Sequence, residues 1–115
     1  MSYVEVEGKR LPVMFNTNAL IEFEDITGLD VTAGVEYKDL RKLKNQRALA
    51  YVGLKHGHLA QQMEFTLTVE STGHLVDLKG KFMAVVMAAF NKDVGAEEAS
   101  MEVLSDEKKK QAGAS

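Results

Sequence analysis

Residues 15–28 read FNTNALIEFEDITG and have the pattern of one capped helix. Asn16 or Thr17 can accept hydrogen bonds from the first-turn amides, which otherwise lack partners. Gly28 suits the left-handed conformation that often closes a helix. The apolar residues recur at helical spacing and should face the core, whereas the acidic residues should point mainly away from it. The apolar stripe is Ala19, Leu20, Phe23 and Ile26, and the acidic residues are Glu22, Glu24 and Asp25.

The flanking segments predict a small mixed fold. Residues 3–7 alternate apolar and acidic side chains, as in a half-buried strand, and a turn at Gly8 and Lys9 leads into a second strand that ends near Phe15. Pro12 lacks an amide hydrogen, so that strand should lie at an edge. The predicted class is α+β, mostly α, with an N-terminal β-hairpin at about 3–15 and four or five helices at about 17–27, 46–56, 67–77 and 79–91.

Length and composition indicate one domain. The 115 residues suffice for one hydrophobic core, which we place in residues 1–92, with a charged tail over 93–115 that is weakly helical or disordered. The absence of cysteine excludes disulfides and thiolate metal sites. No N-terminal signal is evident, and the longest apolar run, residues 82–90, is about half a membrane span. We therefore expect a soluble, cytoplasmic protein.

The second long helix has two interpretations. It is either one helix capped near Asp39 or, as we prefer, a short turn over 39–43 and a main helix capped by Asn45 and ended by Gly57. Apolar residues surround its circumference over 48–54, so it should be central and buried.

Arg47 is the unusual residue of this helix. If the helix begins near Asp39, its guanidinium falls among apolar residues and needs a carboxylate, for which Glu24 or Asp77 are candidates. If the helix begins at Asn45, Arg47 lies near the surface instead.

The next helix can be capped by Thr66 or Thr68, and Gly73 on its apolar face would permit close contact with another helix. The last helix carries two apolar faces, which is more than one small core needs. We interpret the second face and a thin apolar stripe in the tail as a surface for a partner or for self-association. The alternative is that this face packs against the helix at 46–56 in the same subunit. The predicted surface is Met83, Met87, Phe90, Met101, Val103 and Leu104.

No constellation predicts an enzyme, a cofactor or a metal. His56 and His58 lack a third ligand at a convincing spacing, and carboxylates at the offsets of Glu22, Glu24 and Asp25 fan around a helix instead of converging. Lys42, Lys44, Arg47 and Lys55 could contact phosphate, but no helix-turn-helix pattern or aromatic interleaving accompanies them, so we expect no nucleic-acid binding.

Charge is distributed unevenly along the chain. Residues 1–30 hold six acidic and two basic residues, whereas residues 36–55 hold six basic and two acidic ones. Opposite poles of this kind could pair subunits head to tail. The simpler interpretation is two solvated faces that differ in charge.

The order of these segments resembles the tail assembly chaperones of long-tailed, non-contractile bacteriophages. The resemblance spans roughly residues 3–92. It rests on the opening strand pair and on four later segments: FNTNALIEFEDITG at 15–28, RALAYVGLKH at 47–56, FTLTVE at 65–70 with Leu75, Val76 and Asp77, and a helix ending AAFNK at 88–92.

This resemblance implies a function. Such proteins bind the tape measure protein, keep its apolar surface soluble and help recruit tail tube subunits in the host cytoplasm, and they are absent from the mature virion. Many have a longer form made by a programmed frameshift, for which an A-rich run encoding residues 108–110 would be suitable. The tail tube protein would be contacted through the C-terminal region or that longer form, and the family tends to form homo-oligomers. Alternatives are a head-tail joining or tail terminator protein and, less favoured, a small nucleic-acid-binding regulator.

Overall fold

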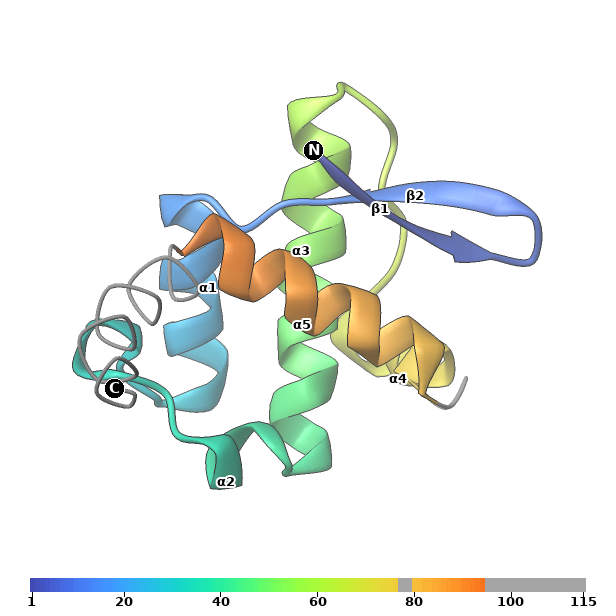
Figure 1. The fold of residues 1–115 in the computed structure, drawn as a ribbon. Coiled ribbons are helices and arrows are strands. Elements are labelled where there is room, and N and C mark those ends of the chain that lie inside the picture. Colours follow the sequence, from blue (N-terminus) through green and yellow to red (C-terminus); the bar gives the residue numbers. More distant parts are fainter. Residues whose placement is uncertain (77–79, 95–115) are drawn as a thin grey trace, which may run out of the picture.

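A computed structural model describes residues 1–76 and 80–94. Within these ranges an antiparallel hairpin precedes five α-helices and one 3-10 turn, which confirms the predicted α+β, mostly helical class (Figure 1). The elements are β1 (Ser2–Val6), β2 (Lys9–Val13), α1 (Thr17–Thr27), η1 (Val31–Ala33), α2 (Tyr37–Leu40), α3 (Leu43–Ala60), α4 (Val69–Val76) and α5 (Lys81–Asp93).

The hairpin turns one residue earlier than predicted. Glu7 and Gly8 occupy the turn with φ of 52° and 83°, and a two-residue turn needs positive φ at both positions to match the twist of the strands. Pro12 lies opposite Tyr3 in this sheet. Because the sheet has only two strands, the missing amide hydrogen of Pro12 does not cost a hydrogen bond to a further strand. β2 packs on α3 and β1 on α5, so the hairpin is held by helices.

Helix α1 has the predicted caps. The Asn16 Oδ1 accepts from the Ala19 amide at 2.9 Å, and Gly28 has a φ of 78° with its amide donating to the Glu24 carbonyl at 2.8 Å. Its inward stripe is narrower than predicted, because Ile26 remains 40% exposed. The prediction that Glu22 points away from the core is wrong, since its carboxylate bonds to side chains of α3.

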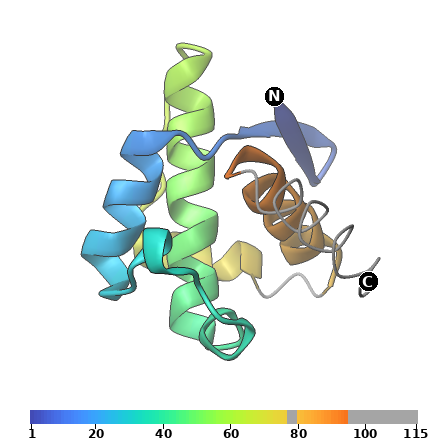
Figure 2. The ribbon, with the colours of Figure 1, turned by 60° about the vertical axis from the view of Figure 1, so that its left-hand side comes forward.

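Helix α3 is central, as predicted, and lies between α1 and α5 (Figure 2). Both of its predicted ends are wrong. It begins at Leu43, and Asn45 lies inside it, where its Nδ2 donates to the Asp39 carbonyl at 2.8 Å. It also runs through Gly57 to Ala60.

Gly57 is required for packing and does not end the helix. A Cβ atom there would lie 2.3 Å from the Pro12 carbonyl oxygen, so only glycine lets the backbone of β2 rest directly on α3. Gly53 serves similarly one turn earlier, where a Cβ would lie 2.5 Å from the ring of Phe15.

Helix α4 begins at Val69, two residues later than predicted. Thr68 caps it: its Oγ1 accepts from the Ser71 amide at 3.0 Å, and the Ser71 Oγ accepts from the Thr68 amide at 2.8 Å. A Cβ at Gly73 would lie 3.2 Å from Cδ of Arg47, which confirms the predicted close contact with another helix and identifies that helix as α3.

Helix α5 crosses α3 and buries one face. Its buried residues are Phe82, Val86, Ala89 and Phe90. The helix ends at Asp93, two residues later than predicted, and the predicted tail beyond Val94 lies outside the described residues. The Asp93 Oδ2 accepts from the Phe15 amide at 2.9 Å, which joins the end of α5 to the segment between β2 and α1.

Candidate binding pocket

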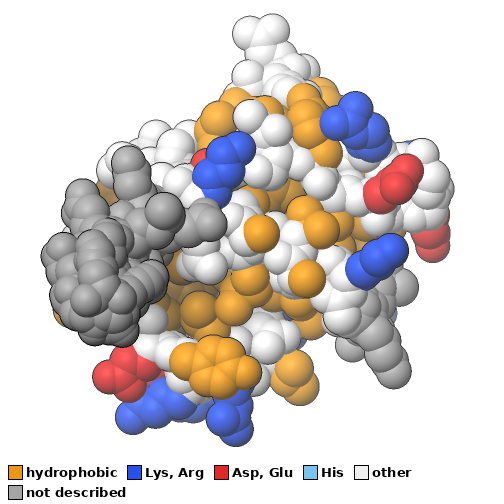
Figure 3. All heavy atoms as spheres, viewed as in Figure 1, with side chains coloured by type: hydrophobic (Ala, Val, Ile, Leu, Met, Phe, Trp, Pro, Cys, Tyr) orange, Lys and Arg blue, Asp and Glu red, His pale blue; other side chains and the backbone are white. Residues whose placement is uncertain are grey.

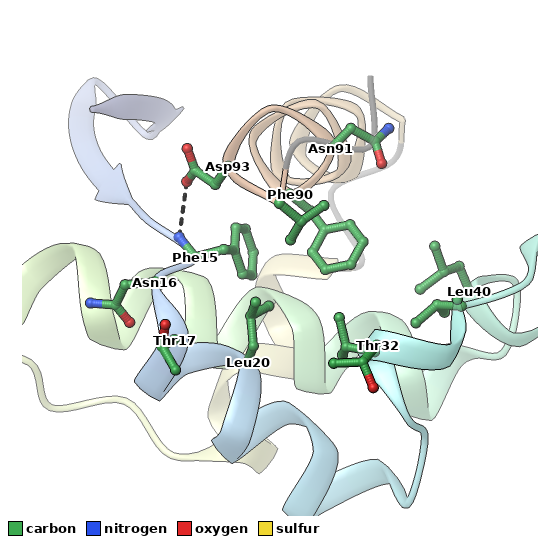
Figure 4. A pocket seen from close by; sticks show the side chains of 13 residues that line it. Phe15, Asn16, Thr17, Leu20, Thr32, Leu40, Phe90, Asn91 and Asp93 are labelled. Atoms are coloured by element: carbon green, nitrogen blue, oxygen red, sulfur yellow. Dashed lines mark hydrogen bonds between the residues drawn. The ribbon is translucent and has the colours of Figure 1, made fainter. Parts of the chain in front are cut away.

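A cavity of about 700 Å³ lies between α1, η1, α2 and the C-terminal end of α5, and we call it the α1–α5 pocket (Figure 4). This volume lies within the range of about 300–1,000 Å³ that is usual for ligand pockets. Most of the side chains that line it are apolar. They are Phe15, Leu20, Val31, Val35, Leu40, Phe90 and Val94, and the polar rim includes Asn16, Thr17, Thr32, Asn91 and Asp93.

Two aromatic rings form one wall of the pocket. Phe15 and Phe90 are both buried and meet edge to face, with ring centroids 5.4 Å apart at 88°. Phe90 also approaches Phe23 of α1, at a centroid distance of 6.4 Å. Leu20 of α1 and Leu40 of α2 face these rings across the cavity (Figure 4). The wall formed by the rings is therefore part of the hydrophobic core.

The opposite wall is held by hydrogen bonds to α1. The Val31 amide donates to the Glu24 Oε2 at 2.8 Å, and Asp30 caps η1 by accepting from the Thr32 amide at 3.0 Å. Hydrogen bonds from the Thr32 hydroxyl and from the backbone amides of Ala33 and Thr32 lower the pKa of Asp30 below its usual 3.8. Glu24 is thus engaged by η1 and does not pair with Arg47, which corrects one of the two partners predicted for Arg47. The other, Asp77, lies outside the described residues.

The chemistry of the pocket suits apolar groups. Among the described residues that line it, Asp93 is the charged one, and its carboxylate accepts a hydrogen bond from the Phe15 amide. Leu20, Val31 and Val35 are only half-buried, so an incoming apolar side chain would cover surface that is now exposed to water.

A basic segment adjoins the pocket. Lys38, Arg41, Lys42 and Lys44 are all exposed and flank the pocket residue Leu40 in sequence. The neighbouring Tyr37 and Leu43 are 74% and 73% exposed. Figure 3 shows hydrophobic side chains across this face of the molecule, with Lys and Arg side chains at the lower edge, where Figure 1 places α2.

The described residues of the predicted partner surface differ in their burial. Phe90 is 5% exposed and belongs to the core, so it is not available to a partner in this structure. Met83 and Met87 are half-buried at the edge of the core. Met101, Val103 and Leu104 lie outside the described residues. The pocket has no signal in the sequence because its residues come from four separate segments, of which the loop after Gly28 shows no periodicity.

A polar cluster joins α1 to α3. The Glu22 carboxylate accepts from the Lys55 Nζ at 2.9 Å and lies 2.8 Å from the His56 Nε2, which must carry the proton because an ionised carboxylate only accepts. Partial burial alone would raise the pKa of Glu22, but the bonds from His56 and Lys55 outweigh it and lower that pKa below its usual 4.5. The hydrogen bond to Glu22 raises the pKa of Lys55 above its usual 10.5. The acidic segment 1–30 and the basic segment 36–55 are therefore joined within one subunit by the Glu22–Lys55 ion pair.

Glu22→Gln should remove this cluster's pH dependence. Because the folded-state pKa of Glu22 lies below the unfolded value, its contribution is present above about pH 4.5 and is lost as pH falls through the folded-state pKa. We expect Glu22→Gln to lower the free energy of unfolding by about 1 kcal/mol at pH 7 and to have less effect in acid. Urea unfolding at several pH values measures this. Asp25→Asn, on the exposed side of α1, is the control, and an equal loss at every pH would contradict the prediction.

The two neighbouring histidines have structural partners. His56 bonds to Glu22, and the Nδ1 of His58 donates to the Leu54 carbonyl at 2.6 Å while its ring lies against Phe65. Across residues 1–76 and 80–94, no group of three or more ligand-type side chains is close enough to hold a metal ion.

None of the helices in the described part of the chain is both long enough and apolar enough to cross a membrane. Comparison of the sequence with protein-family models and with curated proteins, and of the structure with solved structures, found no match.

Proposed function

We propose that this protein is a tail assembly chaperone of a long-tailed, non-contractile bacteriophage. In this proposal it binds apolar segments of the tape measure protein in the host cytoplasm, keeps them soluble, helps recruit tail tube subunits and leaves before the virion is complete. Two independent features support it: the sequence resemblance over residues 3–92 and the open apolar α1–α5 pocket.

The pocket is the observation on which the binding mode rests. A long helical client presents apolar side chains at positions i, i+3, i+4 and i+7 along one face, and such anchors enter apolar grooves in other complexes. The half-buried Leu20, Val31 and Val35 would contact these anchors, with the buried Phe15 and Phe90 behind them.

The expected affinity of a single pocket for a client segment is low. Fully burying one large apolar side chain contributes about 1.5–3 kcal/mol, and the loss of translational and rotational freedom on association offsets several such contacts. A pocket that takes one or two anchors would therefore bind each client segment weakly and reversibly. Homo-oligomers would place several pockets along one client and strengthen binding by multivalency.

Val35→Glu should disrupt client binding. A carboxylate placed on the apolar rim would have to be buried without a partner when a client docks. Co-expression with the tape measure protein of the same phage should leave most of that protein soluble with the wild-type chain, and at least fivefold less with Val35→Glu.

Ile26→Glu is the matched control, because Ile26 is an exposed apolar residue of α1 outside the pocket. Equal client solubility with wild type, with both variants and with no added protein would refute the chaperone proposal. Finding the protein in purified virions would instead favour a structural joining or terminator role.

A further inference from the structure

We infer that the α1–α5 pocket is also a docking site for this chain's own C-terminal segment, residues 97–107. The inference goes beyond the proposed function, because it concerns the free protein and needs no client. It rests on three observations: the position of Val94, the composition of residues 97–107 and the charge beside the pocket.

The first observation is connectivity. Val94 follows the end of α5 and itself lines the pocket, so the chain continues from the rim of the cavity. Six residues separate Val94 from Met101. A stretch of this length spans at most about 20 Å, and a folded-back path of the same length readily returns Met101 to the pocket.

The second observation is composition. Residues 97–107 read EEASMEVLSDE and combine three large apolar residues, Met101, Val103 and Leu104, with five acidic ones. Met101 and Leu104 are three residues apart, a spacing that would put both on one side of a helical turn. The pocket offers the complementary apolar wall in Leu20, Val31 and Val35, which are half-buried.

The third observation is charge. The acidic residues Glu97, Glu98, Glu102, Asp106 and Glu107 bracket the apolar ones. The exposed Lys38, Arg41, Lys42 and Lys44 flank the pocket residue Leu40 in sequence, and of these Lys38 is paired with Glu36 at 3.5 Å. Complementary charges of this kind favour one docking orientation.

The covalent connection favours this segment over a second copy of the chain as the occupant of the pocket. A short covalent linker gives an effective concentration in the millimolar range, far above the micromolar concentration of a second copy in dilute solution. The segment would thus cover the pocket in the free monomer, and any external ligand would have to displace it, with a correspondingly lower apparent affinity.

The natural sequence has no cysteine, so an engineered pair provides the only thiols and a clean test. Thr32→Cys places one thiol on the pocket rim, and Ser105→Cys places the other beside Leu104 without altering an apolar residue. Glu70→Cys with Ser105→Cys is the control pair, because Glu70 is exposed on α4, away from the pocket lining. The dilute full-length variants are oxidised, and monomeric and dimeric disulfides are separated on a non-reducing gel.

We expect the Thr32–Ser105 pair to close within one monomer at least ten times faster than the Glu70–Ser105 pair. Adding Met101→Ser and Leu104→Ser to the first pair should reduce its rate to that of the control, and Lys42→Glu with Lys44→Glu should slow it severalfold. Equal rates for the two pairs would overturn the inference, as would disulfide-linked dimers as the main product. Asn91→Cys, on the α5 side of the pocket, replaces Thr32→Cys if the latter lowers the thermal midpoint.

The crosslinking test and the tape measure solubility test can fail independently of each other. Equal crosslinking rates would leave a permanently open pocket that still binds a client. Rapid crosslinking with no effect on tape measure solubility would leave a self-covering pocket with another ligand.

Discussion

Phe90→Ala is expected to lower the free energy of unfolding by about 3–5 kcal/mol, the usual effect of truncating a buried phenylalanine. Phe90 is 5% exposed and contacts the rings of both Phe15 and Phe23, so its removal leaves a cavity where α5 meets α1. Because domains of this size are stable by only about 5–15 kcal/mol, the variant should unfold at markedly lower urea concentration. Circular dichroism during urea titration measures the change.

Met87→Ala is the control for Phe90, since Met87 lies on the same helix but is half-buried. Its loss should be less than half as large. If Phe90→Ala kept wild-type stability and instead weakened self-association, Phe90 would be a partner contact and the core described here would be wrong.

Gly57→Ala is expected to be the second most damaging change, with a net loss of at least about 2 kcal/mol. In an unobstructed helix, alanine is favoured over glycine by roughly 1 kcal/mol. Here the added methyl would lie 2.3 Å from the Pro12 carbonyl oxygen and 2.7 Å from the Val13 amide nitrogen. Backbone atoms of β2 cannot rotate away, so the hairpin must shift off α3, and overpacking of this kind outweighs the gain in helix propensity.

Gly73→Ala tests the same gain in helix propensity at a position where the added methyl group meets a flexible side chain and no backbone atoms. Its added methyl would meet the Cδ of Arg47 at 3.2 Å, and that side chain can adjust by a few tenths of an ångström. We expect a change within about 1 kcal/mol of wild type. Thermal unfolding of both variants provides the comparison, and a Gly57→Ala protein as stable as Gly73→Ala would show that the hairpin does not rest on α3.

Local signals in the sequence predicted local structure well. The caps at Asn16 and Gly28 depend on atoms within a few residues, and both were predictable. Gly57 shows the limit: glycine after a helical run usually indicates an end, and only the distant Pro12 shows why the helix continues. The partners of Glu22 also lie on another helix, so helical periodicity alone assigned its side chain to the wrong side.

The same limit applies to the candidate site. Periodicity gave α5 two apolar faces but could not show that Phe90 packs on Phe15 and Phe23. The α1–α5 pocket combines residues from the segment before α1, from α1, from the loop through η1 to α2 and from α5. No single segment carries a signal for such a cavity, because its shape depends on how all four are placed by α3.

The most direct test of the central claim is to map where the client binds. Methyl-labelled protein is titrated with an apolar helical segment of the tape measure protein, and chemical-shift changes are followed by NMR. We predict that the largest changes cluster at Leu20, Val31, Val35 and Leu40, and that Val35→Glu abolishes them while Ile26→Glu does not. Changes centred on the outer face of α5 at Met83, or no saturable changes at all, would contradict the assignment of the α1–α5 pocket as the client site.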